Sequence, residues 1–221
     1  MRQTYMDSGF LRVLLEPGRF FQERMRGEPG LKIPALIALV IGIIGAVSAA
    51  ISANALTEGL PPDMQVFGLA GVAFAVASGI IGGLITWVAF GIVFYIISMV
   101  FMGDGDFKRT LEFTGYGLIP QVFGGIIGAI FSYQIVSNLS VPIISRPEDI
   151  AVLVESVTTG MLSDPLTPIS GIVGILFLIW SANIWIFGMK YARNLSTRNA
   201  VLTVGIPVGL YILVNLVTLI G

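Results

Sequence analysis

The side chains that could take part in chemistry are few, and three carboxylates among them lie close together. Asp104, Asp106 and Glu112 fall within nine residues of one polar stretch. Two carboxylates that share a proton can activate water for hydrolysis, and three could bind a divalent cation. However, carboxylates that flank a glycine are more often turn and cap residues. The sequence favours this structural interpretation, and we expect no catalytic or metal-ligating residue.

The rest of the composition narrows the chemistry further. Neither His nor Cys occurs in the 221 residues, so imidazole bases, thiolate nucleophiles and disulfides are absent, as are the usual zinc or haem ligands. We expect no cofactor. The net charge of −1 predicts no nucleic-acid partner, because duplex binding needs a basic surface. Only 11% of the residues are charged and 55% are hydrophobic, which is typical of an integral membrane protein.

Uncharged apolar runs predict an all-α polytopic bundle of five transmembrane helices, which occupies residues 33–221. The second run is ambiguous, because the 40 residues from Met64 to Gly103 are long for one span and short for two. Ala53-Asn54-Ala55 follows an apolar run and is similar to a signal-peptidase site, but a polar region of 32 residues precedes that run, so we expect the first span to be retained. The expected spans are 33–55, 71–102, 113–136, 168–189 and 200–220.

The basic residues decide the number of crossings. If the second run crosses once, eleven basic residues share one side of the membrane and only Arg146 lies on the other. Two crossings would nearly abolish this asymmetry, which marks the cytoplasmic face. We therefore expect five spans, with the amino terminus cytoplasmic and the carboxy terminus outside. The eleven are Arg2, Arg12, Arg19, Arg24, Arg26, Lys32, Lys108, Arg109, Lys190, Arg193 and Arg198.

Two segments outside the spans have amphipathic patterns. In residues 1–32, apolar and basic side chains alternate around Pro17, which predicts two short cytoplasmic helices at the membrane interface, with a lead-in role and a docking role both open. In the outer loop, Ser145 and Glu148 match a capping box that opens a helix over about 146–160. We expect this helix to cover the ends of the spans rather than to bind a ligand.

Polar and small side chains inside the spans have two interpretations each. Asn183 and Asn215, on the last two spans, could line a pathway with Gln121, but interhelical hydrogen bonding explains them without a pore. No Asp, Glu, Lys or Arg falls in the centre of a span, which argues against a coupled pump. Three GxxxG pairs permit close packing, either inside the bundle or between copies of the chain. They begin at Gly79, Gly124 and Gly205.

The polar stretch and the start of the third span resemble a known family. Gly115 and Tyr116 form a Gly-Tyr pair that Pro120 follows closely, and this order resembles the Yip1 family of five-span membrane proteins. Near the amino terminus, Pro17, Phe20 and Phe21 resemble the P-x-x-F-F pattern common in prokaryotic members. The cytoplasmic DLYGP motif of eukaryotic members is missing. The resemblance therefore implies an archaeal or bacterial relative in the plasma membrane rather than a partner of Rab GTPases.

The same stretch carries a second, shorter resemblance. Gly103 to Lys108 reads G-x-G-D-x-K, which is similar to the signature of intramembrane aspartyl proteases such as prepilin peptidases. In that family a second aspartate stands at the end of another span. Here the other cytoplasmic aspartates are the adjacent Asp104 and the distant Asp7. The resemblance thus implies one half of a catalytic pair without its partner.

Together these features favour a non-enzymatic membrane scaffold or adaptor of the Yip1 type. Its expected partners are the lipid bilayer and either further copies of the chain or other membrane proteins. A passive channel or carrier for a small solute or lipid is the first alternative, and an aspartyl protease is the second. Any binding role would fall to a small set of side chains, namely Asp104, Asp106, Tyr116, Pro120, Asn183 and Asn215.

Overall fold

The computed structural model describes the backbone of residues 4–220 and the side chains of residues 10–217. Arg2 and the side chain of Asp7 lie outside these described residues. The elements that it describes are all helical. In chain order they are α1 (Thr4–Leu15), α2 (Pro17–Arg24), α3 (Lys32–Glu58), the short 3-10 turn η1 (Pro62–Met64), α4 (Gln65–Val100), α5 (Phe107–Tyr116), α6 (Ile119–Ser137), the turn η2 (Pro147–Asp149), α7 (Ile150–Ser163), α8 (Leu166–Ala192) and α9 (Thr197–Ile220).

Within the described residues, five helices are long and apolar enough to cross a membrane, as the sequence predicts. They are α3, α4, α6, α8 and α9. The ambiguous second run forms one continuous helix, α4, whose 36 residues extend for about 54 Å at 1.5 Å per residue. The third span begins later than expected, at Ile119 instead of residue 113, because residues 113–116 belong to the separate helix α5.

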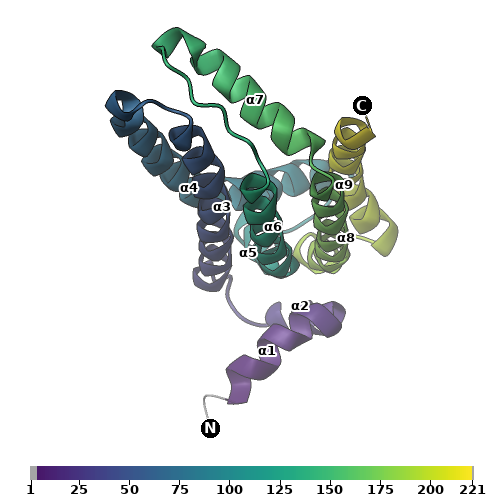
Figure 1. The fold of residues 1–221 in the computed structure, drawn as a ribbon. Coiled ribbons are helices and arrows are strands. Elements are labelled where there is room, and N and C mark those ends of the chain that lie inside the picture. The colour runs from purple at the N-terminus through teal and green to yellow at the C-terminus, as the bar shows by residue number, and fades with distance from the viewer. Residues whose placement is uncertain (1–3, 221) are drawn as a thin grey trace.

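The two ends of the bundle carry different extramembrane pieces (Figure 1). α1 and α2 lie at one end, and α7 lies at the other, together with the carboxy terminus. Because the five long helices alternate in direction, the connection from α8 to α9 and the segment from α4 to α6 return to the end that carries α1 and α2. Basic residues therefore gather at that end, and Arg146 precedes α7 at the other.

The tightest helix pair is α3 with α4, and small residues make it possible. A Cβ atom added to Gly79 would lie 2.6 Å from the Cα of Ala46, and one added to Gly83 would lie 2.6 Å from the Cα of Gly42. No side chain fits at such distances, so these positions let the two backbones approach. The GxxxG pair at Gly79 thus packs inside the bundle, whereas Gly205 and Gly209 on α9 face open space.

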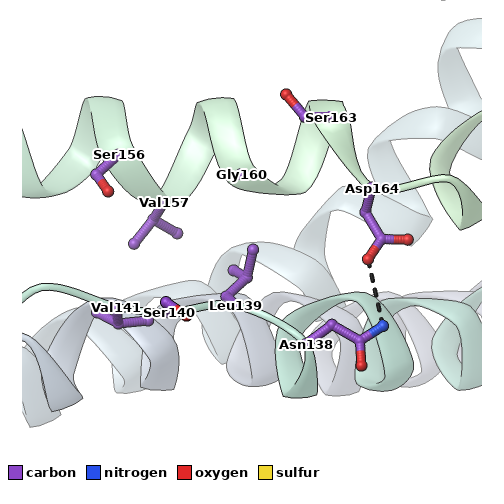
Figure 2. Close-up of a pocket in the computed structure, with 9 residues that line it drawn as sticks. All are labelled: Asn138, Leu139, Ser140, Val141, Ser156, Val157, Gly160, Ser163 and Asp164. Atoms are coloured by element: carbon purple, nitrogen blue, oxygen red, sulfur yellow. Dashed lines mark hydrogen bonds between the residues drawn. The ribbon is translucent and has the colours of Figure 1, made fainter.

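α7 lies across the ends of the spans at the carboxy-terminal end of the bundle. It begins at Ile150, rather than at about residue 146, and continues to Ser163. Arg146 precedes η2 and Asp149 precedes α7, in place of the predicted cap Ser145, and neither side chain makes a cap hydrogen bond. Leu153 and Val157 are buried against apolar residues that include Leu56 and Leu139. Figure 2 shows Val157 turned toward the 138–141 segment, with the Asn138 amide donating to Asp164 over 3.3 Å. A cavity of about 320 Å³ remains between these segments.

Candidate functional site

The best-buried element of the protein is α5, a short helix between the second and third spans. Every residue from Arg109 to Pro120 is buried, including the charged Arg109 and Glu112, whereas Lys108 is exposed. It contacts α3, α4 and α8. The indole nitrogen of Trp87 donates to the Leu111 carbonyl over 2.9 Å, and that of Trp185 donates to the Thr114 carbonyl over 2.7 Å. The two tryptophans thereby fix a polar helix backbone within an apolar bundle.

The glycines on either side of Tyr116 are required by these tryptophans. A Cβ atom on Gly115 would meet Pro34 and the Trp87 indole, and one on Gly117 would overlap the Trp185 indole. Gly117 and Leu118 separate α5 from α6, and Pro120 lies in the first turn of α6, where its missing N–H costs nothing. The Gly-Tyr-Gly and proline pattern is therefore a corner at which the chain turns from α5 into the third span.

A three-residue ionic cluster joins this corner to the amino-terminal helices. The Glu112 carboxylate is fully buried and accepts from Arg24 Nε and from Arg109 Nη1, each over 2.7 Å. Arg109, whose side chain is 7% exposed, also donates to the backbone carbonyls of Arg24 and Gly27. Both buried charges are thus paired and hydrogen-bonded, which is the condition for keeping them out of water. We call Arg24, Arg109 and Glu112 the Glu112 cluster.

The two sequence motifs near Pro17 and Tyr116 pack against each other. The Phe20 ring meets Tyr116 edge-on at 5.0 Å, and the Phe21 ring lies 4.5 Å from that of Phe113. Pro17 ends α1 and opens α2, as predicted, but α2 buries Phe21 against protein. The amino-terminal segment is therefore docked on the bundle through α2, and its Arg24 points to Glu112.

Tyr116 is buried, with 7% exposure, rather than placed at an open membrane interface. Burial raises the pKa of its phenol, while the nearby Arg24 guanidinium opposes the shift and Glu112 adds to it. Pro120 is buried as well. Both side chains pack inside the corner.

The loop before α5 is fastened to the end of α8. Arg193 is 2% exposed, and it donates to Ser98 Oγ over 2.8 Å and to the carbonyls of Gly103 and Gly105. Its guanidinium lies 4.2 Å from the centre of the Tyr95 ring. Gly105 has a φ of +149°, which side chains rarely adopt. The glycines of the G-x-G-D-x-K pattern thus serve a turn around a buried arginine.

Asp104 and Asp106 flank this turn and are exposed. They line a cavity of about 320 Å³ with Arg109, at the end of the bundle rather than within a span. Asp106 takes the position before the first residue of α5, but its side chain makes no cap hydrogen bond. Glu112 faces two arginines instead. Among the described residues no group of carboxylates is arranged to hold a metal ion.

Of the polar residues in the spans, the structure brings Gln121 and Asn215 to one cavity and leaves Asn183 outside it. This cavity has a volume of about 480 Å³ and lies among the spans. The Gln121 amide donates to Ser181 over 3.3 Å, and the Asn215 amide donates to the Tyr211 carbonyl over 2.8 Å. Asn183 is exposed on α8 and does not line the cavity.

Sequence reasoning missed the Glu112 cluster and the role of Arg193. Glu112 lies just before the predicted third span and was considered only as a turn residue or metal ligand. Arg24 and Arg193 were used only to predict which side of the membrane is cytoplasmic. The sequence did contain one signal for part of this cluster. Arg109 and Glu112 are three residues apart, and opposite charges at this spacing lie on one face of a helix and can form an ion pair. The third partner, Arg24, is 88 residues away from Glu112 and no local pattern identifies it.

Comparison with known proteins finds a family whose model covers the α5 corner and the amino-terminal helices. The model of the Yip1 domain matches residues 11–219, which is nearly the whole chain and includes both α2 and the α5 corner. The chain belongs to the Yip1 domain family. An uncharacterized protein of Methanocaldococcus jannaschii is 37% identical over 123 residues, which cover 56% of this chain and 87% of that protein. No solved structure matches.

The two motifs that pack together at the corner between α5 and α6 both lie within the family match. The Yip1 domain match spans both the Pro17 motif and the Tyr116 motif, and the structure packs one on the other. The relative in M. jannaschii is archaeal. Together with the five apolar helices, the Yip1 domain makes the protein an integral membrane protein.

Proposed function

We propose that this Yip1 domain protein is a non-enzymatic membrane scaffold that presents α1 and α2 as an adaptor surface at the cytoplasmic face. The observation that carries the proposal is the Glu112 cluster, which ties α2 to the best-buried helix of the bundle. A lead-in that only orients the first span needs no such tie. The tie holds α1 and α2 in one place, as a docking surface requires.

Large apolar side chains are exposed on α1, which supports a role in contact with a partner. Phe10, Leu11 and Leu15 on α1 are 44%, 56% and 75% exposed. Arg12 pairs with Glu23 on α2 over 3.0 Å, so the two helices present one combined face. Exposed apolar clusters of this kind mark contact sites with proteins or membranes.

Crosslinking in native membranes tests the proposal. The full-length protein is expressed with Leu11→Ser and Leu15→Ser, and its crosslinked partners are identified by mass spectrometry. A matched control is Leu162→Ser on α7, because Leu162 is 67% exposed at the opposite end of the bundle. The scaffold proposal expects the α1 variant to lose partners that the control retains. An identical set of partners for all three proteins would contradict it.

A passive carrier for a small uncharged solute or lipid is the second candidate, and the cavity of about 480 Å³ favours it. Flux through liposomes that contain the purified protein, compared with empty liposomes, would reveal such an activity. The protease alternative rests on Asp106 alone. It requires that Asp106→Asn abolish cleavage of a co-expressed membrane peptide, and unchanged cleavage would remove it.

The proposal also includes self-association and a cytoplasmic amino terminus. Gly205 and Gly209 on α9 contact no other helix closely, so this GxxxG pair is available to a second copy, as GxxxG faces often are. The gathering of basic residues at the α1 and α2 end supports a cytoplasmic location of that end in a prokaryotic plasma membrane.

A further inference from the structure

The cavity among the spans extends along α8. Its lining comes from all five long helices, among them Thr86 of α4, Gln121 of α6, and Asn215 of α9. On α8 the lining runs from Gly171 to Trp185, which is a distance of about 21 Å at 1.5 Å per residue. This length is most of the roughly 30 Å hydrocarbon thickness of a bilayer. The cavity has the length of a lipid chain rather than of a small solute.

The absence of charged residues from the lining indicates what kind of molecule the cavity can hold. None of the residues that line the cavity is charged, and a charged ligand at this depth would carry a large desolvation penalty. The walls are mostly apolar, with aromatic rings of Phe90 and Trp185. These features favour an uncharged, largely apolar molecule.

Polar groups inside the cavity require a hydrogen-bonding group on that molecule. Most hydroxyls of the helices donate to the carbonyl one turn earlier, as Thr203 does to Asn199 over 2.8 Å. Thr86 is exposed and lines the cavity, and within the described part of the chain its hydroxyl makes no such bond. Gln121 uses one amide hydrogen for Ser181, and its side chain has further donor and acceptor capacity.

We propose that this cavity binds an uncharged lipid through one hydrocarbon chain and one carbonyl or hydroxyl group. The chain lies along α8 beside Gly174, and the polar group reaches Thr86 and Gln121. A volume of about 480 Å³ holds one chain with its polar group, and the open side of the cavity leaves a second chain in the bilayer. The proposal is independent of the scaffold role, because it requires binding and no partner protein.

Glycine positions give a clean test. A Cβ atom on Gly174 would meet nothing within 4 Å, so Gly174→Leu fills the cavity without displacing another helix. Gly128 on α6 also faces open space and does not line this cavity, which makes Gly128→Leu the matched control. The full chain is purified in detergent with either dioleoylglycerol or dioleoyl phosphatidylglycerol, and retained lipid is measured by native mass spectrometry.

The proposal expects one dioleoylglycerol to remain on the wild type and on Gly128→Leu, and to be lost from Gly174→Leu. Thr86→Val keeps the shape of the side chain and removes the hydroxyl, so it should weaken retention about fivefold, the equivalent of one hydrogen bond. Apparent melting temperatures verify that each variant folds. Equal retention by all variants, or equal retention of the anionic lipid, would mean annular lipid only and would overturn the proposal.

Discussion

Replacing Glu112 by Gln tests the importance of the ionic cluster. Glu112→Gln keeps the size of the side chain but leaves the charge of Arg109, which is 7% exposed, without a counter-ion. Breaking a buried pair in this way costs about 3–5 kcal/mol. At 2–4 °C per kcal/mol for a protein of this size, the apparent melting temperature should fall by roughly 6–20 °C.

The assay is thermal unfolding of the purified protein in detergent, followed by intrinsic fluorescence. Glu148→Gln is the control, because Glu148 pairs with Arg146 over 3.6 Å and both side chains are 66% exposed. Removing such an exposed pair costs less than about 1 kcal/mol. The control should therefore shift the melting temperature by only a few degrees.

A double variant separates charge burial from packing. Arg109→Met with Glu112→Leu removes both deeply buried charges, and Arg24, whose side chain is 34% exposed, can then turn toward water. Apolar replacement of a whole buried pair is often neutral or stabilising. The double variant should thus be more stable than Glu112→Gln alone. If Glu112→Gln behaves like the Glu148 control, or if the double variant is the less stable of the two, the cluster does not tie α2 to α5 as described.

Three further predictions follow from the packing, the phenol and the topology. Gly83→Leu should destabilise the protein by about 1–3 kcal/mol through overpacking of α3 on α4, whereas Gly128→Leu, which faces open space, should melt near the wild-type temperature. Because the pKa of Tyr116 is raised in the folded state, the unfolded state loses its proton first, so stability should fall as the pH rises above about 10 and Tyr116→Phe should flatten that slope. In this cysteine-free chain, Lys108→Cys should react with an impermeant maleimide only after the cells are opened and Glu148→Cys should react on intact cells, and the reverse pattern would refute the proposed orientation.

The apolar helices could be predicted from the sequence alone. Uncharged runs of the right length predicted the five spans, and the distribution of basic residues predicted a single span between Met64 and Gly103, where the structure has the one continuous helix α4. Pro17 predicted the break between α1 and α2 correctly. These predictions succeed because the cost of exposing backbone or charge to hydrocarbon depends on local composition.

The core of the site could not be predicted in the same way. α5 reads as a polar connection because it contains Lys108, Arg109 and Glu112, yet it is the best-buried helix. Its burial depends on distant partners, namely Arg24 for the carboxylate and two tryptophans on different spans for the backbone. Composition shows which groups are polar, but only the fold shows that Arg109 and Glu112 are buried with hydrogen-bond partners.

The bond between Arg24 and Glu112 also has a consequence for biosynthesis. The two residues are 88 positions apart, and two helices long and apolar enough to cross a membrane, α3 and α4, lie between them. During synthesis the amino-terminal helices must therefore wait near the membrane until α5 has emerged, and α5 cannot enter the bundle at low cost before they arrive. A bulky amino-terminal fusion would hinder this late docking step, so tags are better placed at the carboxy terminus.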